Sequence, residues 1–216
     1  MFIDVQFLKN ENKQIKQLKN LNYDGVFFIT DEPKSYRIIN DFFIAYISLK
    51  PSKKFLSLGI FDNILDFKNN INKFDLFLLD FRKKEDKMDY RNSLFSPSIA
   101  YLPDKYKGLI FPLTFFVNED FEGKAKILGR FKQNIEIIKK KKNKFLPIFA
   151  TLNYFEDMEK VEDPRNIQSL VKILGLNTKD SKRSLGYYLF YLYKQKLMEK
   201  NARLYEKDFL IFGDRP

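Results

Sequence analysis

The local sequence around Arg165 does not explain why an arginine stands at this position. Arg165 lies in the stretch KVEDPRNIQSLVKILGL, residues 160–176. Asp163 is a good N-cap, Pro164 suits the first helical position, and apolar residues then recur at helical spacing, which predicts a helix that begins at Asp163. The helix dipole disfavours a cation in the first turn, so Arg165 is a candidate for a role other than helix stability. The alternative is a solvated side chain or an ion pair with Glu162.

Two carboxylates in predicted strands are candidates for metal chemistry. Asp4 in FIDVQF and Asp80 in FLLDFR could bind Mg²⁺ at the mouth of a barrel. Asp4 sits in mid-strand, and Asp80 precedes Arg82, so an ion pair with Arg82 is the favoured interpretation of Asp80. The chain has no histidine and no cysteine, which excludes a histidine-dependent enzyme, thiolate metal sites and disulfides. A metal-dependent phosphoesterase of this sequence would have to use carboxylates only.

The composition indicates a globular protein with an anionic partner. The chain has 216 residues, 44% of them hydrophobic, and a formal charge of +11. Such a charge favours a polyanionic partner, either nucleic acid or an acidic membrane surface. The longest apolar run, LIFPLTFFV at 109–117, is too short to cross a bilayer, and no signal peptide is recognisable, so we expect a soluble, cytoplasmic chain without a membrane partner.

Short apolar runs alternate with amphipathic helical patterns, which predicts an α/β fold with a mainly parallel sheet. The pattern allows either a closed barrel or an open doubly wound sheet. Helices are expected at 13–21, 62–71 and 122–142. Strands are expected at 2–8, 25–30, 42–49, 55–60, 75–81, 109–116 and 145–152.

From residue 163 onward the pattern is helical, with helices expected at 163–174 and from Thr178 to about 200. Most aromatic residues of YYLFYLYK, 187–194, are expected to pack in the core rather than to stack on bases. No linker composition separates this tail from the rest, so we expect a single domain, 1–216.

The helix over 122–142 carries basic residues beside its apolar stripe. Lys124, Arg130 and Lys132 are candidates for neutralising RNA phosphates. The lysine run at 139–142 complements the helix dipole, and we interpret it as a solvated helix end.

The order of these segments resembles the archaeal and eukaryotic ribonuclease P protein component 3 family, the thirty-kilodalton subunit, in its archaeal form. The resemblance rests on FIDVQF, FSPSIAY, LIFPLTFF, KAKILGRFKQNIEIIKK and, most specifically, FLPIFATLNYFEDMEKVEDPRNIQSLVKILGL with the helix TKDSKRSLGYYLFYLY after it. It implies a TIM-barrel-like fold, related to polymerase and histidinol phosphatase domains, with extra C-terminal helices.

The resemblance also implies a function and partners. This chain would be a non-catalytic subunit of ribonuclease P that stabilises the catalytic RNA while the 5′ leader of precursor tRNA is removed. Mg²⁺ would belong to the RNA active site, and the chain itself would bind no cofactor or metal. A small α/β protein subunit of the same holoenzyme would be a further partner.

For the residues, the resemblance places Arg165 near the barrel mouth and associates it with RNA, with Lys182 and Arg183 as companions. Family members carry a longer basic segment after the SP step, where this chain has only SIAYLPDKYKG. Arg91, Lys105 and Lys107 are the candidate substitutes. Two other classes stay open: the carboxylate-only phosphoesterase, and a basic scaffold that binds another acidic surface.

Overall fold

The strands form a curved, mainly parallel sheet. The computed structural model describes residues 1–82, 92–116, 119–140, 143–153 and 161–198. The strand order is β1-β2-β4-β5-β6-β7-β8, and all six pairings along it are parallel. These strands are β1 (Ile3–Phe7), β2 (Gly25–Thr30), β4 (Phe42–Ser48), β5 (Leu56–Phe61), β6 (Leu76–Leu79), β7 (Lys107–Pro112) and β8 (Phe145–Ala150).

The two ends of this sheet meet through the residues that follow β8. The Leu152 amide donates to the Val5 carbonyl at 3.0 Å, and the Phe7 amide donates to the Asn153 side chain at 2.7 Å. The sheet therefore curls back on itself and is nearly closed into a barrel. The α/β, TIM-barrel-like fold expected from the sequence is confirmed.

One strand departs from the parallel pattern. The three-residue β3 (Arg37–Ile39) pairs antiparallel with the start of β4 through a turn at Asn40 and Asp41. Both turn residues have positive φ, 49° and 60°, a conformation that Asn and Asp tolerate better than most residues. The sequence pattern did not predict β3, because its side chains are all exposed and carry no strand alternation.

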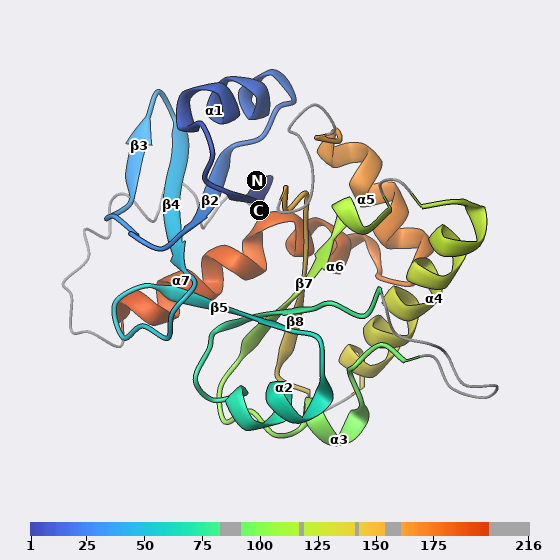
Figure 1. The fold of residues 1–216 in the computed structure, drawn as a ribbon. Coiled ribbons are helices and arrows are strands. Elements are labelled where there is room, and N and C mark those ends of the chain that lie inside the picture. The colour runs from blue at the N-terminus through green and yellow to red at the C-terminus, as the bar shows by residue number, and fades with distance from the viewer. Residues whose placement is uncertain (83–91, 117–118, 141–142, 154–160, 199–216) are drawn as a thin grey trace.

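The helices before residue 140 pack outside the sheet (Figure 1). Aromatic contacts attach them: Phe67 of α2 meets Phe77 of β6 with ring centroids 5.2 Å apart, and Phe131 of α4 meets Phe111 of β7 at 5.0 Å. These helices are α1 (Glu11–Asn20), α2 (Ile64–Asn70), α3 (Pro97–Ala100) and α4 (Phe121–Ile138), with a 3-10 turn, η1, at Leu113–Phe116.

The C-terminal helices are α5 (Pro164–Ile173), α6 (Thr178–Lys182), a π-helical turn η3 (Arg183–Tyr187) and α7 (Tyr188–Met198). The single helix expected from Thr178 to about 200 is thus divided. Gly186 lies against the start of β1, where a Cβ would come within 2.9 Å of the Ile3 amide nitrogen. This close approach explains why glycine stands at the junction.

Helix α7 covers the amino ends of the strands. Tyr193 packs edge-on against Phe27 and Phe43, near the starts of β2 and β4, and Leu192 lies beside Gly108 at the start of β7. Phe190 and Tyr193 are buried, and the partly buried Tyr188 and Tyr191 pack against the core, so the expectation that most aromatic residues of YYLFYLYK belong to the core is met. Side chains of α7 therefore cover the amino ends of β2, β4 and β7.

Candidate nucleic-acid interface

Arg165 lies in the first turn of α5. The Asp163 side chain caps the helix by accepting from the Arg165 amide at 2.7 Å, as the sequence predicted. The Tyr23 hydroxyl donates to the Glu162 carbonyl at 3.0 Å and fastens this helix start to the outside of the sheet. The Arg165 side chain is exposed, and within the described residues it forms no ion pair. It is placed to reach a ligand in solution.

The two companions predicted for Arg165 follow α5 in the chain. Lys182 is the last residue of α6, and Arg183 is the first residue of η3. Lys182 is exposed, and the Arg183 guanidinium carbon lies 5.4 Å from the Tyr187 ring centroid. That these two cations act together with Arg165 stays a prediction.

The three candidates on α4 divide into two kinds. Lys124 and Lys132 are exposed and available to phosphate. Arg130 is buried: one guanidinium nitrogen donates to the Phe81 carbonyl at 2.6 Å, and the group lies 5.4 Å from the Phe81 ring centroid. The prediction that Arg130 contacts RNA does not fit this position, because a buried guanidinium that donates to a backbone carbonyl is not accessible to a ligand. The helical spacing of apolar residues placed Arg130 beside the apolar stripe of α4, but it could not predict the contact with the Phe81 carbonyl.

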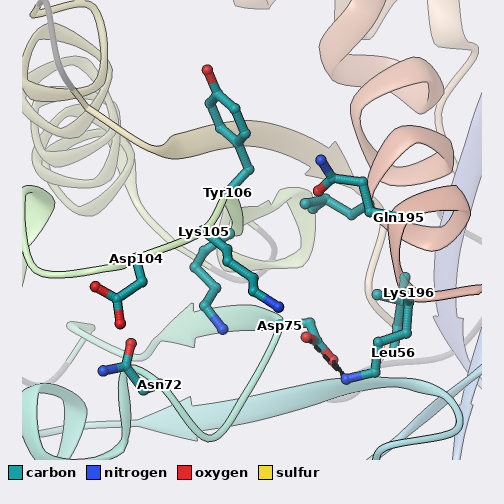
Figure 2. A pocket seen from close by; sticks show the side chains of 10 residues that line it. Leu56, Asn72, Asp75, Asp104, Lys105, Tyr106, Gln195 and Lys196 are labelled. Carbon is teal, nitrogen blue, oxygen red and sulfur yellow. Dashed lines mark hydrogen bonds and ion pairs between the residues drawn. The ribbon is translucent and has the colours of Figure 1, made fainter. Parts of the chain in front are cut away.

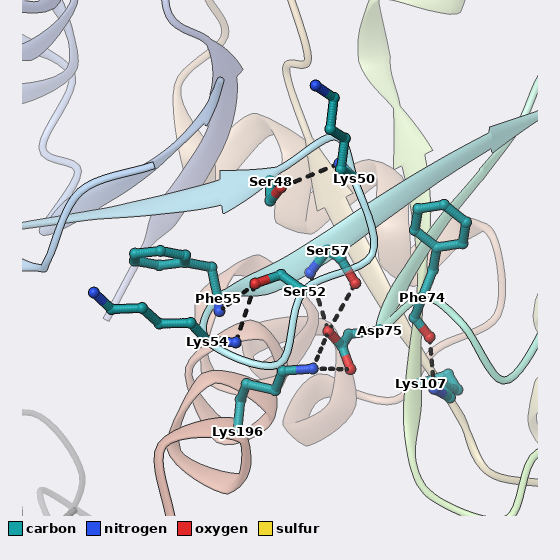
Figure 3. A network of polar contacts seen from close by, with 10 residues as sticks. All are labelled: Ser48, Lys50, Ser52, Lys54, Phe55, Ser57, Phe74, Asp75, Lys107 and Lys196. Carbon is teal, nitrogen blue, oxygen red and sulfur yellow. Dashed lines mark hydrogen bonds and ion pairs between the residues drawn. The ribbon is translucent and has the colours of Figure 1, made fainter. Parts of the chain in front are cut away.

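The candidates around the SP step also differ from one another. Lys105 is exposed at the amino end of β7. Lys107 is 7% exposed and donates to the Phe74 carbonyl at 2.5 Å, so it fastens β7 to the segment before β6 (Figure 3). Lys107 is thus a structural residue rather than the RNA contact that was predicted. Arg91 lies outside the described residues.

The carboxylates of the phosphoesterase alternative do not converge. The Asp80 carboxylate accepts two hydrogen bonds from the Arg82 guanidinium, at 2.9 and 2.7 Å, which confirms the predicted ion pair. These bonds raise the pKa of the Arg82 guanidinium. No group of three or more acidic residues that could hold a metal ion occurs in the part of the chain that the structure describes.

Asp4 lies in β1 and belongs to a buried polar network. Its carboxylate accepts from the Thr151 amide at 2.7 Å and from the Gln6 side chain at 2.8 Å, and Gln6 in turn accepts from Gln14 of α1 at 2.9 Å. Burial raises the pKa of Asp4, although the hydrogen bonds from Thr151 and Gln6 partly oppose this shift. Asp4 connects β1 to the end of β8 and to α1, and it is shielded from any ligand.

Four lysines precede the strands of the second half, and only Lys105 among them was singled out from the sequence. Lys54, Lys73 and Lys144 stand just before β5, β6 and β8, and Lys105 stands just before β7. The amino ends of neighbouring parallel strands lie along one edge of a sheet, so these four lysines share the amino-end side of the barrel. The signal was present as a lysine shortly before four successive apolar runs. We call Lys54, Lys73, Lys105 and Lys144 the lysine rim.

The described helices include none that is both long enough and apolar enough to cross a membrane. Together, the described features define a TIM-like barrel with a basic surface and no recognisable catalytic cluster among the described residues. The chain is similar to a chain of a solved structure described as the cryo-EM structure of archaeal ribonuclease P with mature tRNA. The TM-score is 0.63, the identity is 15%, and the likeness covers 93% of this chain and 94% of the other.

At this identity the likeness establishes the fold. No family model matches the sequence. A search of curated proteins likewise found no match.

Proposed function

We propose that this chain is a non-catalytic protein subunit of ribonuclease P, which binds and stabilises the catalytic RNA during removal of the 5′ leader from precursor tRNA. The observation that carries the proposal is the likeness to a chain of an archaeal ribonuclease P structure over nearly the full length of both chains. The order of sequence segments points to the same family independently of that likeness. Its partners would be the ribonuclease P RNA, precursor tRNA and a small α/β protein subunit, and it would act in the cytoplasm.

The surface chemistry supports binding rather than catalysis. A formal charge of +11 and exposed cations such as Arg165, Lys124 and Lys132 suit the RNA backbone, because phosphate contacts supply most of the affinity of such proteins. Asp4 is buried and Asp80 is paired with Arg82, so neither carboxylate is available as a base or metal ligand. Mg²⁺ would be held at the RNA active site, and no step of the reaction is assigned to a side chain of this protein.

Copurification tests the partners directly. The chain would be tagged in its native cells and isolated at moderate salt, and the bound RNA and proteins would be identified. The proposal expects ribonuclease P RNA and a small α/β protein to be enriched. Enrichment of membrane lipid or of an acidic protein without that RNA would favour the basic-scaffold alternative instead.

A further inference from the structure

A pocket of about 250 Å³ opens at the amino ends of β5, β6 and β7, beside α7 (Figure 2). Its location is unusual for this fold, because the sites of α/β barrels lie at the carboxyl ends of the strands. Arg165 and the carboxyl end of β8 therefore do not account for it. Its walls are mostly polar, with Leu56 and Leu192 as the apolar lining.

Two walls of the pocket are fixed by internal contacts. The Lys196 ammonium of α7 lies 2.9 Å from the Asp75 carboxylate, which also accepts from the Ser57 amide and hydroxyl at 3.0 Å (Figure 3). Lys107 is held by the Phe74 carbonyl at 2.5 Å. These groups give the pocket its shape, and their charges and hydrogen bonds are already used within the fold.

The lysine rim surrounds this opening. Lys105 lines the pocket, and its side chain runs into the space between Asn72 and Asp75 (Figure 2). Lys73 adjoins Asn72 in sequence, and the Lys144 ammonium donates to the carbonyl of Asp104, another lining residue, at 2.6 Å. A row of cations along one edge of a groove is the arrangement that tracks a phosphate backbone.

An exposed aromatic ring and an amide complete the site. Tyr106 is 45% exposed, and its ring stands edge-on to Tyr191 with centroids 6.0 Å apart. The Gln195 side-chain nitrogen donates to the Tyr191 hydroxyl at 2.7 Å, and Gln195 and Tyr106 both line the pocket. An aromatic face offers stacking to any base, and a carboxamide can hydrogen-bond to a base edge.

We propose that this pocket binds one unstacked nucleotide of a single-stranded RNA, with the base on Tyr106 and Gln195 and a phosphate on Lys105. The neighbouring phosphates of the strand follow the lysine rim. Inorganic phosphate alone is a poorer ligand, because Asp75 and Asp104 also line the pocket and only the base gains from Tyr106. The choice of RNA as ligand rests on the proposed RNA-binding role. The pocket is formed by this chain alone, so its test uses the isolated chain and needs no other ribonuclease P subunit.

The test measures the dissociation constant of a fluorescein-labelled hexauridylate by anisotropy at several salt concentrations. Lys105→Ala should reduce the slope of log K against log salt by about 0.7, the value for one phosphate of a single strand. Tyr106→Ala should weaken binding about tenfold at every salt concentration and leave the slope unchanged, because stacking involves no counterion. Tyr106→Phe keeps the ring and should restore the affinity.

The matched controls are Tyr101→Ala and Lys16→Ala, which remove an exposed tyrosine and an exposed lysine outside the pocket. Both should bind like the unaltered chain. Competition with uridine monophosphate shows whether the pocket binds a free nucleotide or an RNA strand. Effective displacement of the labelled hexauridylate identifies a free nucleotide, and failure to displace it identifies an RNA strand. Losses in the controls equal to those of Lys105→Ala and Tyr106→Ala, or equal affinity for a fully paired duplex, would overturn the proposal.

Discussion

The Lys196 ammonium on α7 lies 2.9 Å from the Asp75 carboxylate just before β6, and both side chains are largely buried, with 14% and 20% exposed. This ion pair joins the last described helix to the amino-end side of the barrel. Because Asp75 is also the acceptor for Ser57, it holds three elements together: α7, β5 and the start of β6. Lys196 and Asp75, which are 121 positions apart in the sequence, thus connect α7 to the amino ends of β5 and β6.

Removal of Asp75 should cost more stability than removal of Lys196. Asp75→Ala leaves the Lys196 charge without its partner and Ser57 without its acceptor, a loss of about 2–3 kcal/mol in the free energy of unfolding. Lys196→Ala leaves Asp75 bonded to Ser57 and should cost about 1 kcal/mol. Urea denaturation measures both, with Lys179→Ala on α6 as an exposed control expected within about 0.5 kcal/mol. Equal losses in both variants would show that the Ser57 contacts contribute nothing.

Arg165→Ala should separate binding from stability. The side chain is exposed, so unfolding should change by no more than about 0.5 kcal/mol, as for an ordinary surface substitution. Binding of ribonuclease P RNA, or reconstituted leader cleavage, should nevertheless weaken. Arg165→Lys should recover only part of the loss, because lysine cannot grip a phosphate with two parallel hydrogen bonds. A large thermal shift with unchanged RNA binding would make Arg165 a structural residue.

Two basic residues of α4 should behave oppositely. Arg130→Ala removes a buried donor from the Phe81 carbonyl and leaves a void in the core, so it should cost about 2–4 kcal/mol of stability. Lys132→Ala, on the exposed face of the same helix, should leave stability unchanged and weaken RNA binding modestly. Thermal unfolding and anisotropy on both variants check this contrast. It would fail if Lys132→Ala proved the more destabilising of the two.

Asp4 should make stability depend on pH in a direction unusual for a carboxylate. Its folded pKa is raised above the ordinary value of 3.8 by burial, so the folded chain holds the proton more tightly than the unfolded chain. The stability that the protonated group contributes is complete below pH 3.8 and is lost as the pH rises through the raised folded pKa.

Asp4→Asn removes this titration. Relative to the unaltered chain, the variant should gain stability as the pH rises, and the gain should level off above the folded pKa of Asp4. Urea unfolding at a series of pH values measures the difference. Parallel curves for the two proteins would mean that Asp4 does not titrate in this range.

Particular residues show what the sequence could and could not predict. The apolar runs located β1, β2 and β4 to β8, because strands buried on both faces read as continuous apolar segments. The same pattern could not decide between a barrel and an open sheet. That closure depends on hydrogen bonds made by Leu152 and Asn153, whose partners in β1 are about 150 residues away in sequence.

Side-chain roles were less predictable than elements, because they depend on tertiary partners. Arg130 and Lys107 read as surface cations, yet each reaches a backbone carbonyl of a distant segment and is buried there. The cap at Asp163 and the pair Asp80–Arg82 were predictable because they are local.

Cleavage of the 5′ leader tests most directly whether the chain acts in ribonuclease P as a binding subunit. Precursor tRNA and Mg²⁺ would be incubated with the chain alone, and with archaeal ribonuclease P RNA and its other protein subunits in the presence or absence of the chain. We expect no cleavage by the chain alone and a clear stimulation of 5′ leader removal when it completes the assembly. Specific cleavage by the chain alone that disappears in Asp80→Asn, or an assembly whose rate the chain leaves unchanged, would contradict this role.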